Sequence, residues 1–183
     1  MNLGFDLDGV IIDHADHKKA LLTKRGFSDA AHFEHHEIRN LLGDKEYKAF
    51  QNELYGRMSL YAPEIVGAKE SLTRLKAAGH NLRIVSQRAL GKDFAFQWLS
   101  DHGFQGHLFP DSAIHFVVTN EDKEIICRQF GIALHVDDSL SVLRILSTPQ
   151  HRILFGYSGS IPPAATAVAP DWPSVERYIA SRS

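Results

Sequence analysis

The stretch FDLDGVIID, residues 5 to 13, places three aspartates among apolar residues near the start of the chain. Unpaired carboxylates are unfavourable inside a buried strand, because burial removes the water that stabilises their charge. Asp6 and Asp8 are therefore expected where the strand leaves the core, and Gly9 allows the chain to turn sharply there. Asp13, at the far end, is interpreted as a cap or turn residue. We predict that Asp6 and Asp8 belong to a functional site at the end of a buried strand.

The composition is that of a globular protein with one main domain. The chain has 183 residues, of which 44% are apolar and 23% charged, and its net charge is −2. This balance gives no bulk attraction to nucleic acid or to an acidic membrane. Cys127 is the single cysteine, so no internal disulfide can form, and no apolar run approaches the roughly 18 residues of a membrane span. We expect a cytoplasmic protein without a signal peptide or membrane contact, for which nucleic acid is not the expected partner.

Short apolar runs alternate with helical patterns along the chain. The runs interpreted as buried parallel strands are residues 2–6, 82–86, 114–118, 133–137 and 152–155. The stretches with helical periodicity are residues 68–78, 92–102, 121–130 and 140–146, with a last helix near 173–181. Gly79, Gly103 and Gly131 follow the first three helices as C-terminal caps. Residues 157–171 are rich in Gly, Pro, Ser and Ala and are interpreted as a loop. The alternation predicts an α/β fold with a doubly wound, Rossmann-like parallel sheet.

One segment interrupts this alternation. Residues 14–62 contain no strand candidate but show helical spacing, as in HKKALLTKRGF and YKAFQNELYGRM. We interpret them as a small helical insertion, called the cap below, with Pro63 at its exit. Residues 1–13 and 63–183 then form the core domain. Because the cap follows the first strand directly, it is expected over the carboxyl end of the sheet, where open α/β sheets bind ligands.

Polar residues that could take part in catalysis or ligand binding stand at the ends of separate predicted strands. Asp6 and Asp8 follow the first strand, Ser86 ends the second, and Asp137 with Asp138 ends the fourth. Lys123 lies in the helix that precedes the fourth strand. Strand ends of a parallel sheet share one edge, so these side chains are expected to converge. Several carboxylates in one place repel one another unless a cation neutralises them, and hard oxygen ligands suit Mg²⁺. A hydroxyl and an ammonium group suit phosphate oxygens. The pattern predicts a magnesium-dependent phosphoryl-transfer site.

These motifs resemble those of the haloacid dehalogenase (HAD) superfamily. FDLDGV is similar to its first motif, an apolar strand followed by D-x-D-G-[VT]. IVS at residues 84–86 resembles the second motif, Lys123 the third, and HVDDS at residues 135–139 the fourth. The match runs through the whole predicted core in the right order. The resemblance implies a HAD-like Rossmannoid core with a small helical type 1 cap.

The resemblance also implies a chemical role for each acidic residue. Asp6 would be the nucleophile that forms an aspartyl-phosphate, and Asp8 the general acid and base. Mg²⁺ would be held by the Asp6 carboxylate, the Asp8 backbone carbonyl and Asp138, with Asp137 in or near this set. The aspartate at position 8 favours a phosphatase or phosphomutase over the ion pumps and dehalogenases of the superfamily.

The phosphate-binding residues implied by the resemblance are Ser86 and Lys123, together with backbone N–H groups around residues 7–10. Gln87 is a further candidate, and Arg88 could also reach the phosphate. Each has a plainer interpretation. Serine ends many strands as a turn residue, and NEDKE around Lys123 is typical of a solvated first turn of a helix. Asp137 and Asp138 could instead cap the helix that follows them.

The eleven histidines give no recognisable metal-binding pattern. His14 with His17, and His35 with His36, could share a helix face, but no zinc motif such as H-E-x-x-H is completed. We interpret them as solvated or substrate-facing, with His14 of special interest because it follows the first motif directly. Cys127, on an apolar helix face, is expected to be inert core.

The leading functional hypothesis is a phosphomonoester hydrolase that acts on a small phosphorylated metabolite. The string LYAPEIVGAKESLTRLKAAGHNLRIVSQR, residues 60–88, loosely resembles 5′-deoxyribonucleotidase-like members and favours a nucleoside monophosphate. A sugar-phosphate phosphatase, a phosphomutase and a non-catalytic module that binds a phosphate ligand are the alternatives. The sequence leaves the oligomeric state open.

Overall fold

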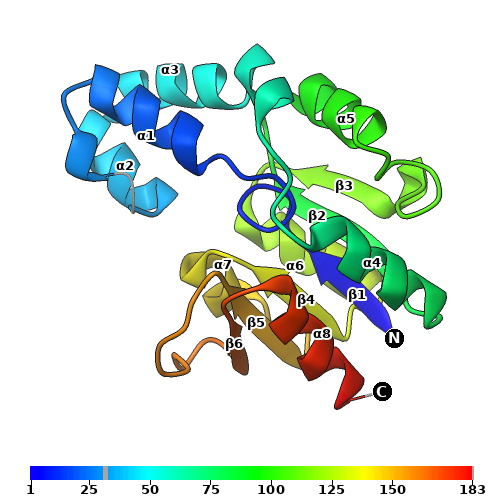
Figure 1. Cartoon of the computed structure of the whole chain (residues 1–183). Coiled ribbons are helices and arrows are strands. Elements are labelled where there is room, and N and C mark those ends of the chain that lie inside the picture. Colours follow the sequence, from blue (N-terminus) through cyan, green and yellow to red (C-terminus); the bar gives the residue numbers. More distant parts are fainter. Residues whose placement is uncertain (31–32, 183) are drawn as a thin grey trace.

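The computed structural model describes residues 1–30 and 33–182, and its centre is a six-stranded sheet with the order β3-β2-β1-β4-β5-β6 (Figure 1). All neighbouring strands pair in parallel. The strands are β1 (Asn2–Phe5), β2 (Asn81–Gln87), β3 (Ile114–Val117), β4 (Leu134–Asp137), β5 (His151–Phe155) and β6 (Ala167–Ala169). The predicted α/β class with a parallel sheet is confirmed.

Strand β6 corrects the prediction that residues 157–171 form a loop throughout. Ala167 and Ala169 pair with Ile153 and Phe155 of β5 and are buried. A strand of three small residues carries no apolar run long enough to be recognised in a sequence rich in Ala and Pro. It forms the edge of the sheet, where pairing on one side is sufficient.

Helices cover both faces of the sheet, because successive strand residues point to opposite faces. Ile84 packs in a cluster with residues of α4 (Ala68–Ala77), α5 (Lys92–Asp101) and α8 (Trp172–Ala180). Val85 packs in a second cluster with residues of α6 (Asn120–Gln129) and α7 (Leu140–Ile145). Cys127 is buried in that second cluster, as expected of a core residue. The doubly wound arrangement is confirmed.

The described residues between β1 and α4 form helices with their own apolar cluster. The elements are α1 (Ala15–Lys24), the 3₁₀ turn η1 (Ser28–Ala30), α2 (His35–Leu42), α3 (Asp44–Leu54) and the 3₁₀ turn η2 (Arg57–Tyr61). Leu22, Ile38 and Phe50 are among the buried residues of this cluster. Helices α1 to α3 lie together beyond the carboxyl ends of the strands (Figure 1). Residues 31 and 32 of the cap lie outside the described residues.

The entry and exit of the cap run side by side. The Asp13 N–H donates to the Pro63 carbonyl at 2.9 Å, and Ile12 forms an isolated bridge with Glu64. Asp13 Oδ1 accepts from the Ala15 N–H at 2.8 Å, which is a turn contact before α1. None of the described helices is long and apolar enough to cross a lipid bilayer.

Candidate active site

A tight loop after β1 carries Asp6 and Asp8 at the carboxyl edge of the sheet. The Asp6 N–H still pairs with the Val136 carbonyl of β4 at 2.9 Å, so the backbone is fixed up to this point. The loop then closes through the Gly9 N–H, which donates to the Ile12 carbonyl at 2.9 Å. Gly9 has a φ of +85°, a backbone conformation in which a residue with a side chain would be strained. The sequence DGV therefore turns the chain directly after the two aspartates.

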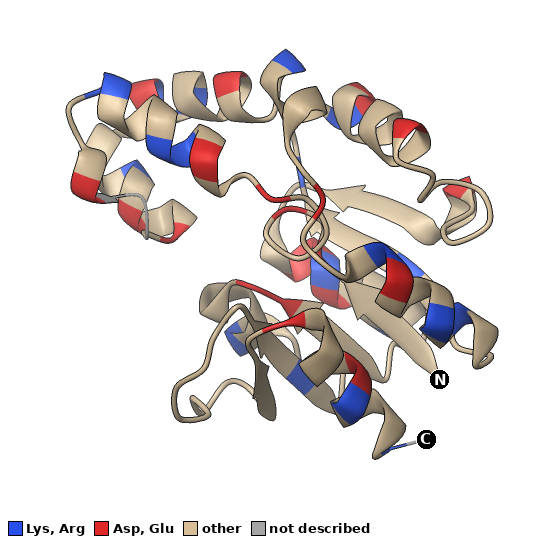
Figure 2. Ribbon diagram, viewed as in Figure 1, with Lys and Arg blue, Asp and Glu red and all other residues tan. Residues whose placement is uncertain are grey.

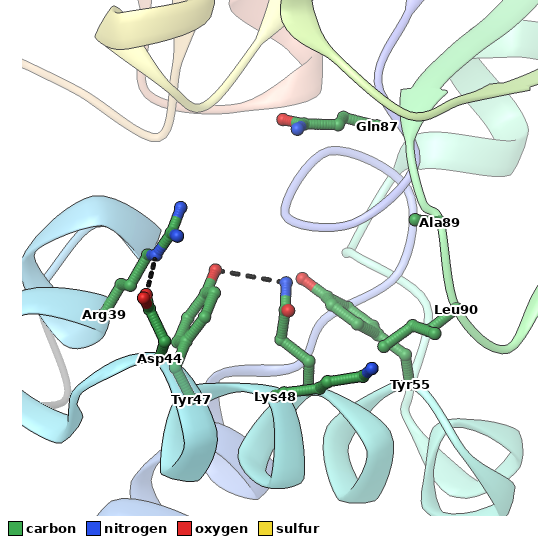
Figure 3. A pocket seen from close by; sticks show the side chains of 9 residues that line it. Arg39, Asp44, Tyr47, Lys48, Tyr55, Gln87, Ala89 and Leu90 are labelled. Carbon is green, nitrogen blue, oxygen red and sulfur yellow. Dashed lines mark hydrogen bonds and ion pairs between the residues drawn. The ribbon is translucent and has the colours of Figure 1, made fainter.

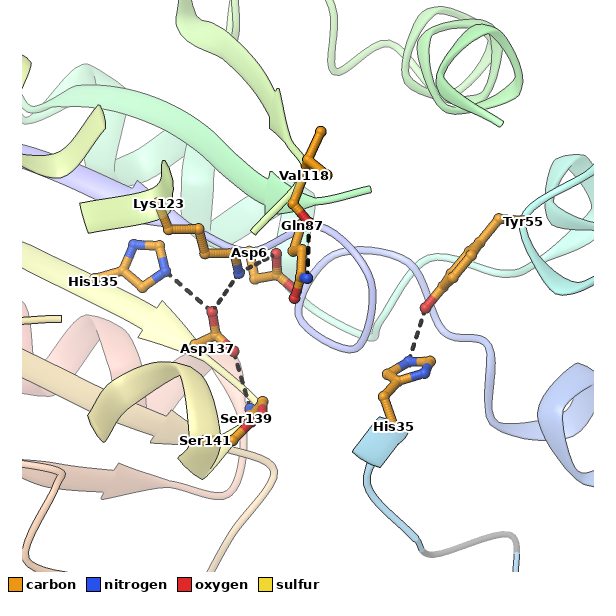
Figure 4. A network of polar contacts seen from close by, with 10 residues as sticks. All are labelled: Asp6, His35, Tyr55, Gln87, Val118, Lys123, His135, Asp137, Ser139 and Ser141. Atoms are coloured by element: carbon orange, nitrogen blue, oxygen red, sulfur yellow. Dashed lines mark hydrogen bonds and ion pairs between the residues drawn. The ribbon is translucent and has the colours of Figure 1, made fainter. Parts of the chain in front are cut away.

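Lys123 joins Asp6 of β1's loop to Asp137 of β4 (Figure 4). Its Nζ lies 2.9 Å from Asp6 Oδ1 and 2.8 Å from Asp137 Oδ2, and the residue is only 1% exposed. The first turn of α6 is fixed by a capping box between Thr119 and Asp122, which places the next residue toward the sheet. The alternative that Lys123 belongs to a solvated helix face is therefore wrong.

His135 supports the same carboxylate, and sequence reasoning did not single it out. Its Nε2 lies 3.2 Å from Asp137 Oδ2, while the Ser139 N–H donates to Asp137 Oδ1 at 3.0 Å (Figure 4). His135 is paired with Gly4 in the neighbouring strand, where a Cβ would come within 2.6 Å of His135 Nδ1. A buried histidine opposite a strand glycine is the signal that could have found it.

The charges of this cluster depend on one another. Burial and the nearby Asp137 and Asp8 carboxylates raise the pKa of Asp6, although the Lys123 ammonium opposes them. Burial would also raise the pKa of Asp137, but Lys123 and the His135 hydrogen bond outweigh it and hold that pKa low. Burial lowers the pKa of Lys123 less than its two carboxylate partners raise it. The ammonium therefore stays charged between a firmly ionised Asp137 and an Asp6 whose charge is incompletely balanced.

Asp138 completes an acidic group whose donor set fits a hard cation. Carboxylate oxygens of Asp6, Asp137 and Asp138 all lie within 4.8 Å of one another, and Asp138 is the exposed member. Although the residue as a whole is exposed, its carboxyl group is packed against protein atoms such as Gly9. This desolvation and the carboxylates of Asp137 and Asp6 raise the pKa of Asp138, so the single ammonium of Lys123 does not neutralise the group. Mg²⁺ prefers such oxygen ligands. Acidic segments meet at this edge of the sheet in Figure 2.

Asp8 is held by two residues that do not belong to the Lys123 cluster. Arg88 Nη1 donates to Asp8 Oδ1 at 2.7 Å, and His14 Nε2 lies 2.7 Å from the same oxygen. Burial would raise the pKa of Asp8, but the Arg88 guanidinium and the His14 hydrogen bond outweigh it and lower that pKa. His14 is itself buried, so it is neither solvated nor free. Arg88, a further phosphate candidate from the sequence, binds Asp8 and the cap residues Tyr55 and Ser59 in this structure.

The remaining phosphate candidates stand at the end of β2 and in the loop after β1. Ser86 is 1% exposed, and its hydroxyl has no hydrogen-bond partner in the part of the chain that the structure describes. Gln87 is exposed, and its amide donates to the Val118 carbonyl at 3.0 Å (Figure 4). In the loop, the Gly9 N–H is already bonded to Ile12. The Ser86 hydroxyl is thus uncommitted among the described residues, whereas the Gln87 amide is partly committed.

An open pocket of about 460 Å³ lies between the cap and the end of β2 (Figure 3). Its lining residues are Arg39, Asp44, Tyr47, Lys48, Gln51, Tyr55, Gln87, Ala89 and Leu90. Arg39 is paired with Asp44 at 2.7 Å, and Gln51 donates to the Tyr47 hydroxyl at 3.1 Å. Lys48 has no ion-pair partner among residues 1–30 and 33–182. The pocket is therefore lined by phenol and amide groups and by the uncompensated cation of Lys48.

No protein-family model and no curated protein matches this sequence. Several solved structures do match the fold of this chain. The chain aligns over 98% of its length with 97% of a conserved haloacid dehalogenase-like protein of unknown function from Agrobacterium tumefaciens, with a TM-score of 0.69 and 20% identity. It aligns over 97% with 97% of a predicted phosphoglycolate phosphatase from Haemophilus somnus 129pt, at 0.61 and 19%. A HAD family hydrolase from Deinococcus radiodurans R1 with bound phosphate and sodium aligns over 98% of this chain and 95% of its own, at 0.61 and 19%. The chain therefore has the fold of the haloacid dehalogenase-like hydrolases.

Proposed function

We propose that this protein is a magnesium-dependent phosphomonoester hydrolase that acts through an aspartyl-phosphate on Asp6. The observation that carries the proposal is the Asp6–Lys123–Asp137 contact beside Asp138 at the carboxyl edge of the sheet. It combines a carboxylate held in place by an ammonium with further oxygen ligands for a cation. The fold shared with HAD phosphatases, and the phosphate bound to one of these similar structures, support the same reaction class.

The proposed reaction has two displacements at phosphorus. The reacting form carries a proton on Asp8, and it is a minor form in the free protein because Arg88 and His14 lower the pKa of that carboxyl. In this form a carboxylate oxygen of Asp6 attacks the phosphorus, the bond to the leaving oxygen breaks, and that oxygen takes the proton from Asp8. Water then attacks the phosphorus of the phosphoenzyme and gives a proton to Asp8. The bond between phosphorus and Asp6 breaks, so phosphate is released and the Asp6 carboxylate is restored. Lys123 fixes Asp6 and balances part of its charge, and the Ser86 hydroxyl is free to donate to a phosphoryl oxygen.

Asp6, Asp138 and the Asp8 backbone carbonyl would hold Mg²⁺, with Asp137 beside them. When bound there, Mg²⁺ offsets the charge of the carboxylates and of the phosphoryl group.

We assign the pocket beneath the cap to the organic group of the substrate. It adjoins Gln87 at the end of β2 and is lined by Tyr47, Lys48 and Tyr55 from the cap (Figure 3). Phenol and amide groups suit a hydroxylated metabolite, and the tyrosines offer faces on which a base could stack. Nucleoside monophosphates and sugar phosphates are therefore the first compounds to test.

The test is phosphate release from 5′- and 3′-nucleotides, sugar phosphates, phosphoglycolate and p-nitrophenyl phosphate, with Mg²⁺ and after chelation. We expect hydrolysis of at least one ester that stops on chelation. Retention of phosphate on a sugar would identify a phosphomutase instead. If no ester gave turnover or a phosphoenzyme, the proposed hydrolase would be rejected in favour of a non-catalytic module that binds a phosphate ligand.

Asp6→Asn is the decisive variant, because it removes the nucleophile while keeping the shape of the side chain. We expect it to fold and to lose essentially all turnover and the mass increase of a trapped phosphoenzyme. Asp13→Asn is the matched control from the same loop, since its contact to the Ala15 N–H can be kept by an amide oxygen. Full activity in Asp6→Asn would reject the proposed nucleophile.

A further inference from the structure

Arg88 is 1% exposed and joins the end of β2 to both Asp8 and the cap. Its Nη1 donates to Asp8 Oδ1 at 2.7 Å. Its Nη2 donates to the Tyr55 carbonyl at 3.2 Å and to Ser59 Oγ at 3.0 Å. The guanidinium also lies 5.0 Å from the centroid of the Tyr55 ring. A rigid planar fork of donors can hold these partners at once, as the point charge of a lysine cannot.

The segment that leads from the core into the cap also contacts Asp8 Oδ1. His14, just before α1, places Nε2 at 2.7 Å from Asp8 Oδ1, and its ring lies edge-on to Tyr55 at 5.7 Å. Asp8 Oδ2 has no hydrogen-bond partner among the described residues. Two hydrogen bonds to Oδ1 fix the carboxylate and leave Oδ2 as the oxygen available for proton transfer.

The contact between Arg88 and the cap depends on close packing of the loop after β2. Gly91 has a φ of +63°, and a Cβ there would come within 1.8 Å of the Tyr55 carbonyl oxygen. The backbone of this loop therefore lies directly against the cap residue that Arg88 binds. The geometry of Asp8 is in this way tied to the docked position of residues 55–59.

We propose that Arg88 is a positioning residue that aligns Asp8 Oδ2 with the leaving group while residues 55–59 are docked against it. This proposal rests on the proposed function, because Asp8 is the acid and base of that reaction. In the first step the leaving oxygen keeps the electron pair of the broken P–O bond and takes the proton from Asp8 Oδ2. Arg88 takes no part in the proton transfer and acts only through the orientation of Asp8.

The test compares two aryl phosphates that differ in their need for an acid. The leaving group of 2,4-dinitrophenyl phosphate departs without protonation, whereas phenyl phosphate releases a phenol with a pKa near that of tyrosine, about 10. The measured quantity is kcat/KM with Mg²⁺, which reports the steps up to formation of the phosphoenzyme. For Arg88→Met we expect a loss of about 10- to 100-fold with phenyl phosphate and less than about threefold with the dinitrophenyl ester.

Two milder variants keep the test meaningful if Arg88→Met does not fold. Arg88→Lys can still reach Asp8 but cannot also hold Tyr55 and Ser59, so we expect a smaller loss with the same preference between the esters. Ser59→Ala removes one cap contact of Arg88 without touching Asp8, and we expect a loss of about three- to tenfold with phenyl phosphate alone. Arg74→Met, which removes an exposed pair with Glu176, is the matched control and should leave both rates unchanged.

The outcomes separate this inference from the proposed function. If the wild type hydrolyses both esters and the folded variants lose rate selectively with phenyl phosphate, Arg88 positions Asp8. Equal losses with both esters, or none, in Arg88→Lys and Ser59→Ala would overturn the positioning role while the hydrolase remains. A wild type that cleaves neither ester with Mg²⁺ would overturn the proposed function, and the acid role of Asp8 with it.

Discussion

Gly9 lies against Asp138, and a Cβ built on Gly9 would come within 2.0 Å of Asp138 Oδ2. The two residues belong to the loop after β1 and to the end of β4, which pair through the adjacent backbone. The absence of a side chain at position 9 thus has two causes, the positive φ and the space taken by a carboxylate of the candidate metal site. Glycine in this motif is needed for the site as well as for the turn.

Gly9→Ala should therefore damage the site more than the backbone conformation alone explains. We expect a loss of about 1–3 kcal/mol in unfolding free energy from the strained φ, and a displacement of Asp138 that weakens Mg²⁺ binding. Denaturant unfolding with and without Mg²⁺ measures both effects. Gly26→Ala is a matched control, because Gly26 has a nearly equal φ of +84° and open space around its Cβ position. If both variants keep the same stabilisation by Mg²⁺, the close approach to Asp138 does not matter for the metal.

Lys123→Met should be among the most destabilising single substitutions in the core. It would leave the buried carboxylates of Asp6 and Asp137 without their shared ammonium. Breaking a buried ion pair by removing one partner costs about 3–5 kcal/mol. Urea unfolding at neutral pH measures the loss, with the exposed Lys45→Met as control. A loss below about 1 kcal/mol would show that the three side chains do not depend on one another for stability.

Lys48 provides a prediction for the pocket beneath the cap. Its cation lines the pocket without an ion-pair partner among the described residues, so it can attract an anionic organic group on a substrate. For such a substrate, Lys48→Gln should raise KM by about three- to tenfold with kcat nearly unchanged, which is the effect of an exposed charge pair. Lys45→Gln, exposed on the same helix but outside the pocket lining, is the control. Equal effects of the two variants would remove Lys48 from substrate binding.

Local sequence signals were sufficient for the core of this fold. Short apolar runs that alternate with helical patterns predicted five of the strands, because strands buried on both faces are apolar throughout. The D-x-D-G motif placed Asp6 and Asp8 after the first strand, since a carboxylate pair and a glycine belong where a strand leaves the core. Strand β6 was missed because its apolar signal is only AVA, and its pairing with β5 comes from tertiary structure.

Side-chain partnerships across the fold could not be predicted in this way. His135 contacts Asp137 because Gly4 in the next strand makes room for its ring, and that pairing needs the strand register. Arg88 was considered for the phosphate, yet its partners come from residue 8 and from residues 55 and 59 of the cap. Such contacts depend on how the cap docks and on side-chain orientation, which no local pattern encodes.

Glu124, next to Lys123 on α6, provides a prediction for the pH dependence of stability. It is 7% exposed and accepts hydrogen bonds from the N–H and hydroxyl groups of Ser147 and Thr148, at distances of 2.5–3.1 Å. Burial would raise the pKa of Glu124, but these donors outweigh it and lower the pKa from its ordinary 4.5 to about 2. The carboxylate thereby holds the loop after α7 against the helix that carries Lys123.

A pKa that is lower in the folded state stabilises the protein above the unfolded pKa, and this contribution is lost as the pH falls through the folded one. The ionised Glu124 should therefore contribute up to about 3 kcal/mol at neutral pH, and progressively less between about pH 5 and pH 2. Glu124→Gln should show a deficit in unfolding free energy that is largest near pH 7 and shrinks on acidification, as measured by urea unfolding at several pH values. Glu121→Gln, exposed one turn earlier on α6, should show no such dependence. A deficit that stays constant from pH 7 to pH 3 would mean that Glu124 acts through its shape and not through its charge.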